Sequence, residues 1–218
     1  MLEAAQPLEL PAGTHLIQTG EVPSQVSFVE SGLLAVSEVS EHGTGRITVL
    51  AGPEAIVPIG LLSESAEPDR VEVWAMVYSR VLRVDANSLR SRLAEGGPLD
   101  TAVRDYLIRL CQRLGADLQI NKDFNLLQRT AATLLELAER LQPEYRLVEE
   151  GRVYPASIVP ISHDVLARRL GTVREVATES LGQLREEGYI ETLYRRVEIE
   201  DPEGLQARAG GAYRQFSC

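Results

Sequence analysis

The sequence has only two cysteines in 218 residues, Cys111 and Cys218. They are too few for a disulfide framework or for the four thiolates of an iron–sulfur cluster. The three histidines, His15, His42 and His163, lack HxH or HExxH spacing, which disfavours a histidine-rich metal site. No run of 18 apolar residues exists, and the N-terminus lacks the basic and apolar segments of a secretory signal. We expect a cytoplasmic protein with free thiols, no metal and no membrane partner.

Lysine is also scarce, because only Lys122 of the 22 basic residues is a lysine. The formal net charge is −10, which argues against a nucleic-acid partner when taken as a sum. The acidity is uneven, however, because residues 151–218 carry nine Arg and ten Asp or Glu and are close to neutral. The last third of the chain is therefore compatible with a phosphate backbone.

The first part of the chain has the pattern of a β-roll. Short β-type runs alternate with glycines, at Gly13, Gly20, Gly32, Gly43, Gly45, Gly52 and Gly60. The clearest run extends from Val71 to Val84, where apolar residues alternate with Glu72, Trp74, Met76 and Tyr78. Short strands separated by glycine turns predict an antiparallel β-roll of the jelly-roll type over residues 1–97.

The pattern changes to a helical period after Gly96-Gly97-Pro98. Apolar residues then recur every three or four positions over residues 98–121, at Val103, Leu107, Leu110, Leu114 and Leu118. Such a stripe packs either on the chain's own roll or, in part, on a second copy of the chain. Because the stripe is nearly five turns long, we predict that these five residues form a dimer interface.

The most informative stretch lies within residues 161–190. Ser162 is suited to cap a helix of two turns that ends at Leu170, and Gly171 suits the turn that follows. A second helix begins near Thr172 or Val173, buries Val173, Ala177, Leu181 and Leu184, and ends at Gly188. Two short strands, residues 189–192 and 195–199, then form a β-wing. These signals predict a winged helix-turn-helix.

One side of the second helix gathers polar residues near its N-terminal end. Arg174 and Thr178 lie one turn apart, as do Glu175 and Glu179. A recognition helix presents such residues to base edges in the major groove. The alternative is an ordinary solvated face, which is more common for charged helices in general, but the wing and the arginine-and-threonine setting favour DNA.

These stretches resemble the CRP/FNR family of bacterial transcription regulators. The most specific match reads Ile161…Leu166-Ala167…Leu170-Gly171-Thr172-Val173-Arg174-Glu175…Leu181…Leu184…Glu187-Gly188-Tyr189-Ile190. Residues 129–138 resemble the first helix after the family's hinge, and the roll resembles its cyclic-nucleotide-binding fold. The resemblance implies an α+β protein with a β-roll over 1–97, a dimerisation helix over 98–121, a winged helix-turn-helix over 122–205 and a tail over 206–218.

The effector cassette departs from the family pattern. In members that bind cyclic nucleotides, a Gly-Glu-Leu segment and an Arg-Ser or Arg-Thr pair hold the ribose and the cyclic phosphate. The matching residues here are Pro58, Gly60, Arg70 and Val71. Pro58 replaces the carboxylate acceptor and also removes a backbone donor, and Val71 replaces the hydroxyl. We therefore expect no cAMP binding, and we expect Arg70 to form a surface or structural ion pair.

The resemblance implies a homodimeric, sequence-specific DNA-binding regulator that is not an enzyme. Ser162 and Thr172 would contact phosphates, while Arg174, Glu175, Thr178 and Glu179 would read bases of a near-palindromic operator. Many such regulators touch RNA polymerase, but no residue here decides between activation and repression. Two other classes stay open: a small-molecule sensor that signals through protein contacts, and a metal-dependent β-roll enzyme, which the scattered histidines disfavour.

Overall fold

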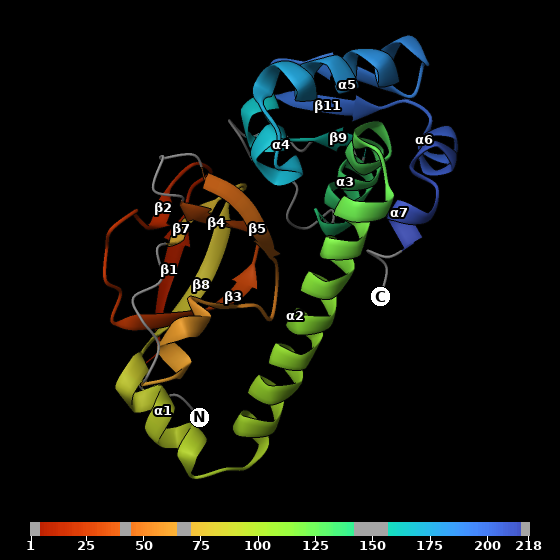
Figure 1. The fold of residues 1–218 in the computed structure, drawn as a ribbon. Helices are drawn as coiled ribbons and strands as arrows, with labels where there is room; N and C mark the ends of the chain where they lie inside the picture. Colours follow the sequence, from red (N-terminus) through yellow and green to blue (C-terminus); the bar gives the residue numbers. More distant parts are fainter. Residues whose placement is uncertain (1–4, 40–44, 65–70, 142–156, 215–218) are drawn as a thin grey trace. The chain divides into compact units, whose positions relative to one another are not determined.

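The computed structural model describes residues 5–39, 45–64, 71–141 and 157–214. They belong to two compact units, Met1–Cys111 and Gln112–Cys218, and each unit is described by itself below (Figure 1). The boundary falls inside the long helix α2, Pro98–Asp123. Within the described ranges, no helix combines the length and the apolar character needed to cross a bilayer.

The N-terminal unit is an antiparallel β-roll of two four-stranded sheets, as predicted. The first sheet has the order β1 (Gln6–Leu10), β8 (Ser79–Asp85), β3 (Gln25–Ser31) and β6 (Ile56–Val57). The second has the order β2 (His15–Ile17), β7 (Val71–Ala75), β4 (Leu34–Val39) and β5 (Gly45–Ala51). A 3-10 helix, η1 (Ile59–Leu62), follows β6, and helix α1 (Ala86–Ala94) follows β8.

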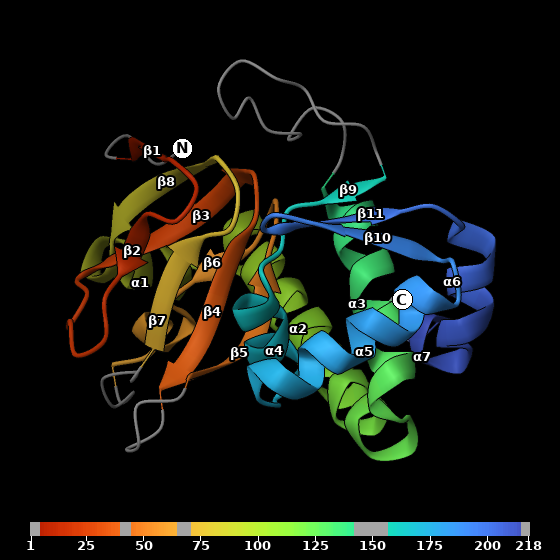
Figure 2. The ribbon, with the colours of Figure 1, turned by 90° about the horizontal axis from the view of Figure 1, so that it is seen from above.

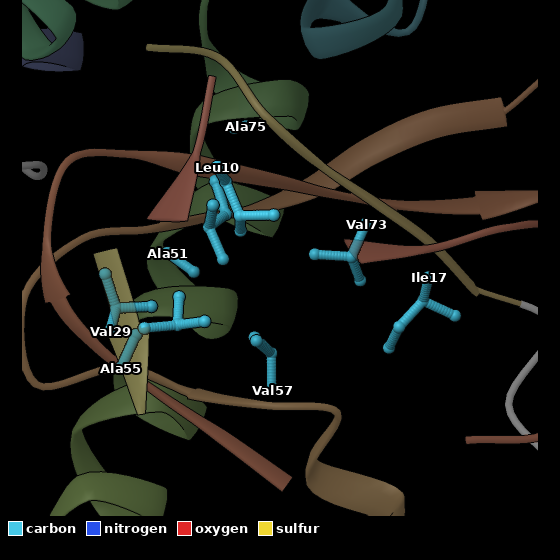
Figure 3. Close-up of a cluster of buried hydrophobic side chains, with 10 residues drawn as sticks. Leu10, Ile17, Val29, Ala51, Ala55, Val57, Val73 and Ala75 are labelled. Carbon is cyan, nitrogen blue, oxygen red and sulfur yellow. The ribbon is translucent and has the colours of Figure 1, made fainter. Parts of the chain in front are cut away.

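The interior of the roll is aliphatic. Figure 3 shows side chains from several strands and loops that converge on one buried cluster, among them Leu10, Ile17, Val29, Val57 and Val73. A second cluster joins the roll to α1 and to the first turns of α2, because it contains Val26, Ile56, Val84, Leu89 and Val103. Burying these side chains supplies the main driving force for this unit.

The run from Val71 to Val84 is not the single alternating strand that the sequence pattern indicates. It forms β7 and β8, which belong to different sheets, and the chain bends at residues 76–78 between them. Gly32 lies against this bend with φ +90°, and a Cβ there would lie 2.3 Å from Ser79 Oγ. That close approach, which periodicity does not reveal, requires glycine.

Helix α2 buries the predicted apolar stripe unevenly, so its five residues are not equally accessible to a second copy. Val103 and Leu110 are buried within the chain itself, and Leu107 and Leu114 are half-buried. Val103 belongs to the roll's second cluster, against which Leu107 also packs. Leu118 alone of the five is largely exposed, at 71%. The first half of the stripe therefore serves the chain's own core.

A different face of α2 is exposed. Ile108, Cys111, Gly115 and Leu118 are all exposed, and their spacings of three and four residues place them on one side of the helix. Alternating steps of three and four are the spacing of a coiled-coil seam. We call these four residues the α2 seam.

The C-terminal unit combines a small sheet with helices, as Figure 2 shows. Its helices are α3 (Leu126–Arg140), α4 (His163–Leu170), α5 (Arg174–Glu186), α6 (Pro202–Ala209) and α7 (Gly211–Arg214). The antiparallel sheet has the order β10 (Ile190–Leu193), β11 (Arg196–Ile199) and β9 (Ile158–Val159). Helix α3 packs against α4, α5, α6 and α7, and fully buried leucines such as Leu134, Leu166 and Leu184 fill the core between helices.

Candidate nucleic-acid interface

Helices α4 and α5 form the predicted helix-turn-helix. Ser162 is the N-cap of α4, and its Oγ accepts a hydrogen bond from the Val165 amide at 3.3 Å. The helix ends at Leu170, and Gly171 has φ 68° and ψ 39°, which is a left-handed conformation. The Thr172 amide then donates to the Ala167 carbonyl at 3.0 Å. Ser162 therefore caps α4 and Gly171 forms the turn, as the sequence predicts.

The prediction that Val173 belongs to the buried stripe of α5 is wrong. Val173 is 59% exposed, because it is the N-cap of the helix and its extended backbone, φ −91° and ψ 158°, takes its side chain off the helical stripe. Ser180 is buried instead, together with Ala177, Leu181 and Leu184.

The four candidate base-reading residues are brought together on α5. Arg174, Glu175, Thr178 and Glu179 are all exposed within the first two turns of the helix. They lie outside the buried stripe of Ala177, Leu181 and Leu184, and because they are exposed they are accessible to a ligand. A two-turn row of donors and acceptors on an exposed helix has the dimensions that major-groove recognition requires.

Two contacts from α4 reach this row, and neither was foreseen from the sequence. Asp164 Oδ2 lies 3.4 Å from Nη1 of Arg174, and both side chains are largely exposed. His163 Nδ1 lies 2.9 Å from Oγ1 of Thr178, whose hydroxyl also donates to the Arg174 carbonyl at 2.8 Å. Because the single hydroxyl proton goes to that carbonyl, Thr178 offers a base an acceptor lone pair or its methyl group, not a donor.

Exposed apolar residues beside the row were also missed. Val173 and Val176 are both exposed, and Val176 lines a hollow of about 320 Å³ between the start of α3 and α5. The hollow is lined by Asn125, Leu126, Leu127, Val176, Glu179, Ser180 and Gln183. Valine methyl groups at the start of a recognition helix suit the methyl group of thymine. The sequence signal for these exposed apolar residues was the presence of Val173 and Val176 next to charged residues at the start of the helix.

The two candidate phosphate contacts lie at helix starts. Ser162 uses an oxygen lone pair for its own cap, which leaves its hydroxyl proton available to donate. Thr172 is half-buried and stands two residues before α5. Valine at the α5 N-cap has no polar side-chain atom, so the first amides of α5 lack a side-chain cap and suit a phosphate oxygen.

The wing forms as predicted, from the antiparallel strands β10 and β11. Tyr194 and Arg195 form its tip, where Tyr194 is 89% exposed and Arg195 has φ 56°. Glu191 pairs directly with Glu198 across the strands. Two carboxylates on one face repel a phosphate backbone, so the tip of the wing suits DNA better than this part of its strands.

The residues predicted to form the effector cassette lie partly in the roll's core. Pro58 is buried at the end of β6, and Gly60 is half-buried within η1. Val71, at the start of β7, packs against the same aliphatic cluster that contains Val57. Arg70 lies outside the described residues. The structure therefore brings Val57, which precedes Pro58, and Val71 to one apolar cluster.

Comparison with known proteins identifies both units. Residues 7–95 match the cyclic nucleotide-binding domain, and residues 128–208 match the Crp-like helix-turn-helix domain. The chain is 41% identical to transcriptional regulator SdrP of Thermus thermophilus over 85 residues, which span 38% of each protein. It is 26% identical over 210 residues to transcriptional activator protein FnrA of Stutzerimonas stutzeri, covering 93% of this chain and 80% of that protein.

Solved structures share the whole architecture. A CRP/FNR-family transcriptional regulator from Thermus thermophilus superposes with a TM-score of 0.74 at 24% identity, covering 94% of this chain and 98% of that one. FixK2 of Bradyrhizobium japonicum superposes with a TM-score of 0.72 at 16% identity, covering 94% and 98%. At these identities the likeness concerns the fold. Together with the two domain matches, it shows that the chain belongs to the CRP/FNR family of transcriptional regulators.

Proposed function

We propose that the protein is a homodimeric, sequence-specific DNA-binding transcription regulator. The observation that carries this proposal is the exposed row on α5, which is held by a capped helix α4 and a left-handed Gly171. A face of donors and acceptors that stays exposed on a well-anchored helix suits the edges of base pairs. The names of the relatives, a transcriptional regulator and a transcriptional activator, agree with this role.

The chemistry of the row assigns a role to each side chain. Arg174 is suited to donate two hydrogen bonds to O6 and N7 of guanine, and Glu175 is suited to accept from N4 of cytosine. Thr178 and Glu179 extend the row by one turn, as acceptors. Ser162, Thr172 and the first amides of α5 would hold phosphates and fix the register of the helix in the groove.

The dimer is supported by the exposed apolar surface of α2. In the α2 seam, Ile108 and Leu118 are 57% and 71% exposed, and Gly115 between them lets a second helix approach closely. The seam therefore replaces Val103, Leu107, Leu110 and Leu114 as the proposed contact, while Leu118 belongs to both sets. Two-fold symmetry would place the recognition helices about 34–36 Å apart, one turn of DNA, which is the spacing in helix-turn-helix dimers generally.

We also propose that cAMP is not the effector of this regulator. Pro58 and Val71 remove an acceptor and a hydroxyl from the cassette, and each unpaired ligand group costs about 1–3 kcal/mol. Titration calorimetry with cAMP is expected to show no binding below millimolar ligand. We also propose that the protein needs no iron–sulfur cluster, acts in the cytoplasm and, like many regulators of this architecture, contacts RNA polymerase.

Selection of bound fragments from random DNA tests the function. It would be run at two salt concentrations, with and without cyclic nucleotides. We expect enrichment of one near-palindromic sequence, weaker binding at high salt because counterions are released, and no effect of cyclic nucleotides. Recovery of sequences no different from the input at both salt concentrations would overturn the proposal. A sequence enriched only with cAMP present would overturn the effector part alone.

A further inference from the structure

The second half of α2 carries three polar residues at intervals of four. Arg113, Asp117 and Asn121 share one face of the helix, and each contacts a different residue of the C-terminal unit. Arg113 donates to Glu136 on α3, and Asn121 accepts from Arg129 on α3. Asp117 accepts from Arg169 on α4, whose Nη1 and Nη2 both lie 3.1 Å from Oδ2. We call Arg113, Asp117 and Asn121, with these three partners, the α2 ladder.

The centre of the ladder is buried. Glu136 is 2% exposed and Arg169 is 8% exposed, and their side chains meet at 3.5 Å. Arg140 adds a further contact to Glu136, at 3.0 Å. Well-packed apolar residues often give equal or greater stability than a buried ion pair. A buried, directional network of this kind instead favours one arrangement of the elements that it joins.

The ladder contacts α4 next to the turn that leads into α5. Arg169 is the penultimate residue of α4, and Leu170 and Gly171 follow it directly. Arg129 also donates to the Leu170 carbonyl, at 3.3 Å. Two arginines therefore join the last turns of α2 to the end of α4, and the recognition helix begins only a few residues later.

The α2 seam lies on another face of the same helix. At 100° per residue, the seam and the ladder are separated by roughly 140° around α2. If a second copy packs on the seam, the ladder determines where α5 stands relative to the dimer axis. This step rests on the proposed function, because it requires a homodimer that reads two half-sites.

We propose that Arg169 and Glu136 are positioning residues that fix the half-site spacing which the dimer accepts. Neither residue needs to touch DNA. A change of one base pair in the spacing rotates one half-site by about 34° around the DNA axis, since a turn contains 10–10.5 base pairs. A rigid ladder would reject that rotation, whereas a loosened one would tolerate it. The identity of the bases that are read would not change.

The test measures binding to DNA that carries two copies of the selected half-site with spacers of different length. Arg169→Lys keeps the charge but loses the planar fork, and Glu136→Gln keeps the shape but loses the charge. We expect the wild type to prefer one spacer over its neighbours by about tenfold, or 1.4 kcal/mol. Both variants should lower that preference to about threefold or less while selecting the same half-site bases.

A matched control uses an ion pair elsewhere in the same unit. Arg208 donates to Glu187 through Nε at 2.9 Å and Nη2 at 3.3 Å, and this pair is more exposed than the ladder. Arg208→Lys makes the same chemical change away from α2 and should keep the spacer preference of the wild type.

The outcomes separate the two proposals. A wild type that binds single half-sites as tightly as paired ones would overturn the dimer, and the proposed function with it. If the wild type prefers one spacer length sharply, and the folded Arg169→Lys and Glu136→Gln variants show the same preference, the ladder proposal alone is overturned. If circular dichroism shows that either buried variant does not fold, Arg113→Lys takes its place, because the Arg113 side chain is partly exposed. A spacer preference in Arg113→Lys equal to that of the wild type would then overturn the ladder proposal.

Discussion

Asp164 and Arg174 form an ion pair across the helix-turn-helix, with 3.4 Å between Oδ2 and Nη1. The arginine that we expect to read guanine is therefore engaged by the preceding helix before DNA arrives. Both side chains are more than half exposed, so the pair is worth little, about 0.2–1 kcal/mol at most. It does not prevent base reading, but it competes with it.

Asp164→Asn should therefore raise the affinity for the operator by up to about fivefold, because the competitor of guanine loses its charge. Fluorescence anisotropy at low salt measures this change. Glu203→Gln is the matched control, since Glu203 and Asp164 each lie in the first turn of a helix of eight residues. An equal gain in both variants would show that only the net charge matters and that the pair is irrelevant.

Arg174 and Thr172 should differ in the kind of binding that they support. Arg174→Ala is expected to cost about 1–3 kcal/mol on the operator and to relax the preference at one base pair. Thr172→Ala should weaken operator and unrelated DNA about equally, because a phosphate contact carries no sequence information. Competition binding with single-base operator variants measures both effects. A uniform loss in Arg174→Ala would contradict its role as a base reader.

Glu179 is predicted to set the base pair at which the half-site departs from the family. The resemblance to the CRP/FNR family implies a second arginine at this position in members whose operators contain TGTGA. A carboxylate cannot donate to guanine and is repelled by phosphates, so it must accept from cytosine or adenine or turn away. It lines the hollow next to α3, which gives it space to turn.

Glu179→Arg should shift selection from random DNA toward the common family sequence at that base pair. Gln183→Arg, one turn further along the same exposed side, is the control and should leave that base pair unchanged. Identical selected sites for the wild type and Glu179→Arg would show that Glu179 does not face the bases.

Much of the recognition unit could be predicted because its signals are local. Ser162, Gly171 and Gly188 each act within a few residues of their own position, so spacing alone places the helix boundaries. The ladder could not be predicted, because Arg169 and Asp117 are 52 residues apart and meet only through tertiary packing. Periodicity located the apolar stripe on α2 but could not tell which of its residues the roll would bury. Val103 and Leu118 are both aliphatic, yet Val103 is buried and Leu118 is exposed.

The choice of seam on α2 gives a prediction about oligomeric state. Leu118→Glu should convert the dimer to a monomer with little loss of folding, since Leu118 is exposed in the chain itself. Leu110→Glu should instead reduce stability, because it places a charge at a buried position. Light scattering and thermal unfolding measure the two effects. Arg109→Glu, exposed and on a different face of α2, should remain dimeric.

Cys111 offers an independent check of the same seam. In a protein with Cys218→Ser, a short bismaleimide should link two copies through Cys111, and Leu118→Glu should abolish this linkage. A Leu118→Glu protein that stays dimeric and still crosslinks would place the interface elsewhere.

Glu136 gives the stability of the protein a distinctive dependence on pH. Burial raises the pKa of Glu136 above its ordinary value, and Arg169 and Arg113 oppose this rise only in part. The groups that face it are Arg113 and Asp117 on α2, Arg140 on α3 and Arg169 on α4. An acid with a raised pKa holds its proton more tightly in the folded protein than in the unfolded chain. Its contribution to stability is therefore fully present below the unfolded pKa of about 4.3 and is lost as pH rises through the folded pKa.

Glu136→Gln cannot titrate at this position, so it removes that dependence. The difference in unfolding free energy between the wild type and Glu136→Gln should become less favourable to the wild type as pH rises above about 4.3. Urea unfolding at several pH values measures it, with Glu186→Gln on the exposed side of α5 as a control that should give a flat difference. A difference that grows in favour of the wild type with rising pH would mean that the arginines outweigh burial. The folded pKa of Glu136 would then lie below that of the unfolded chain.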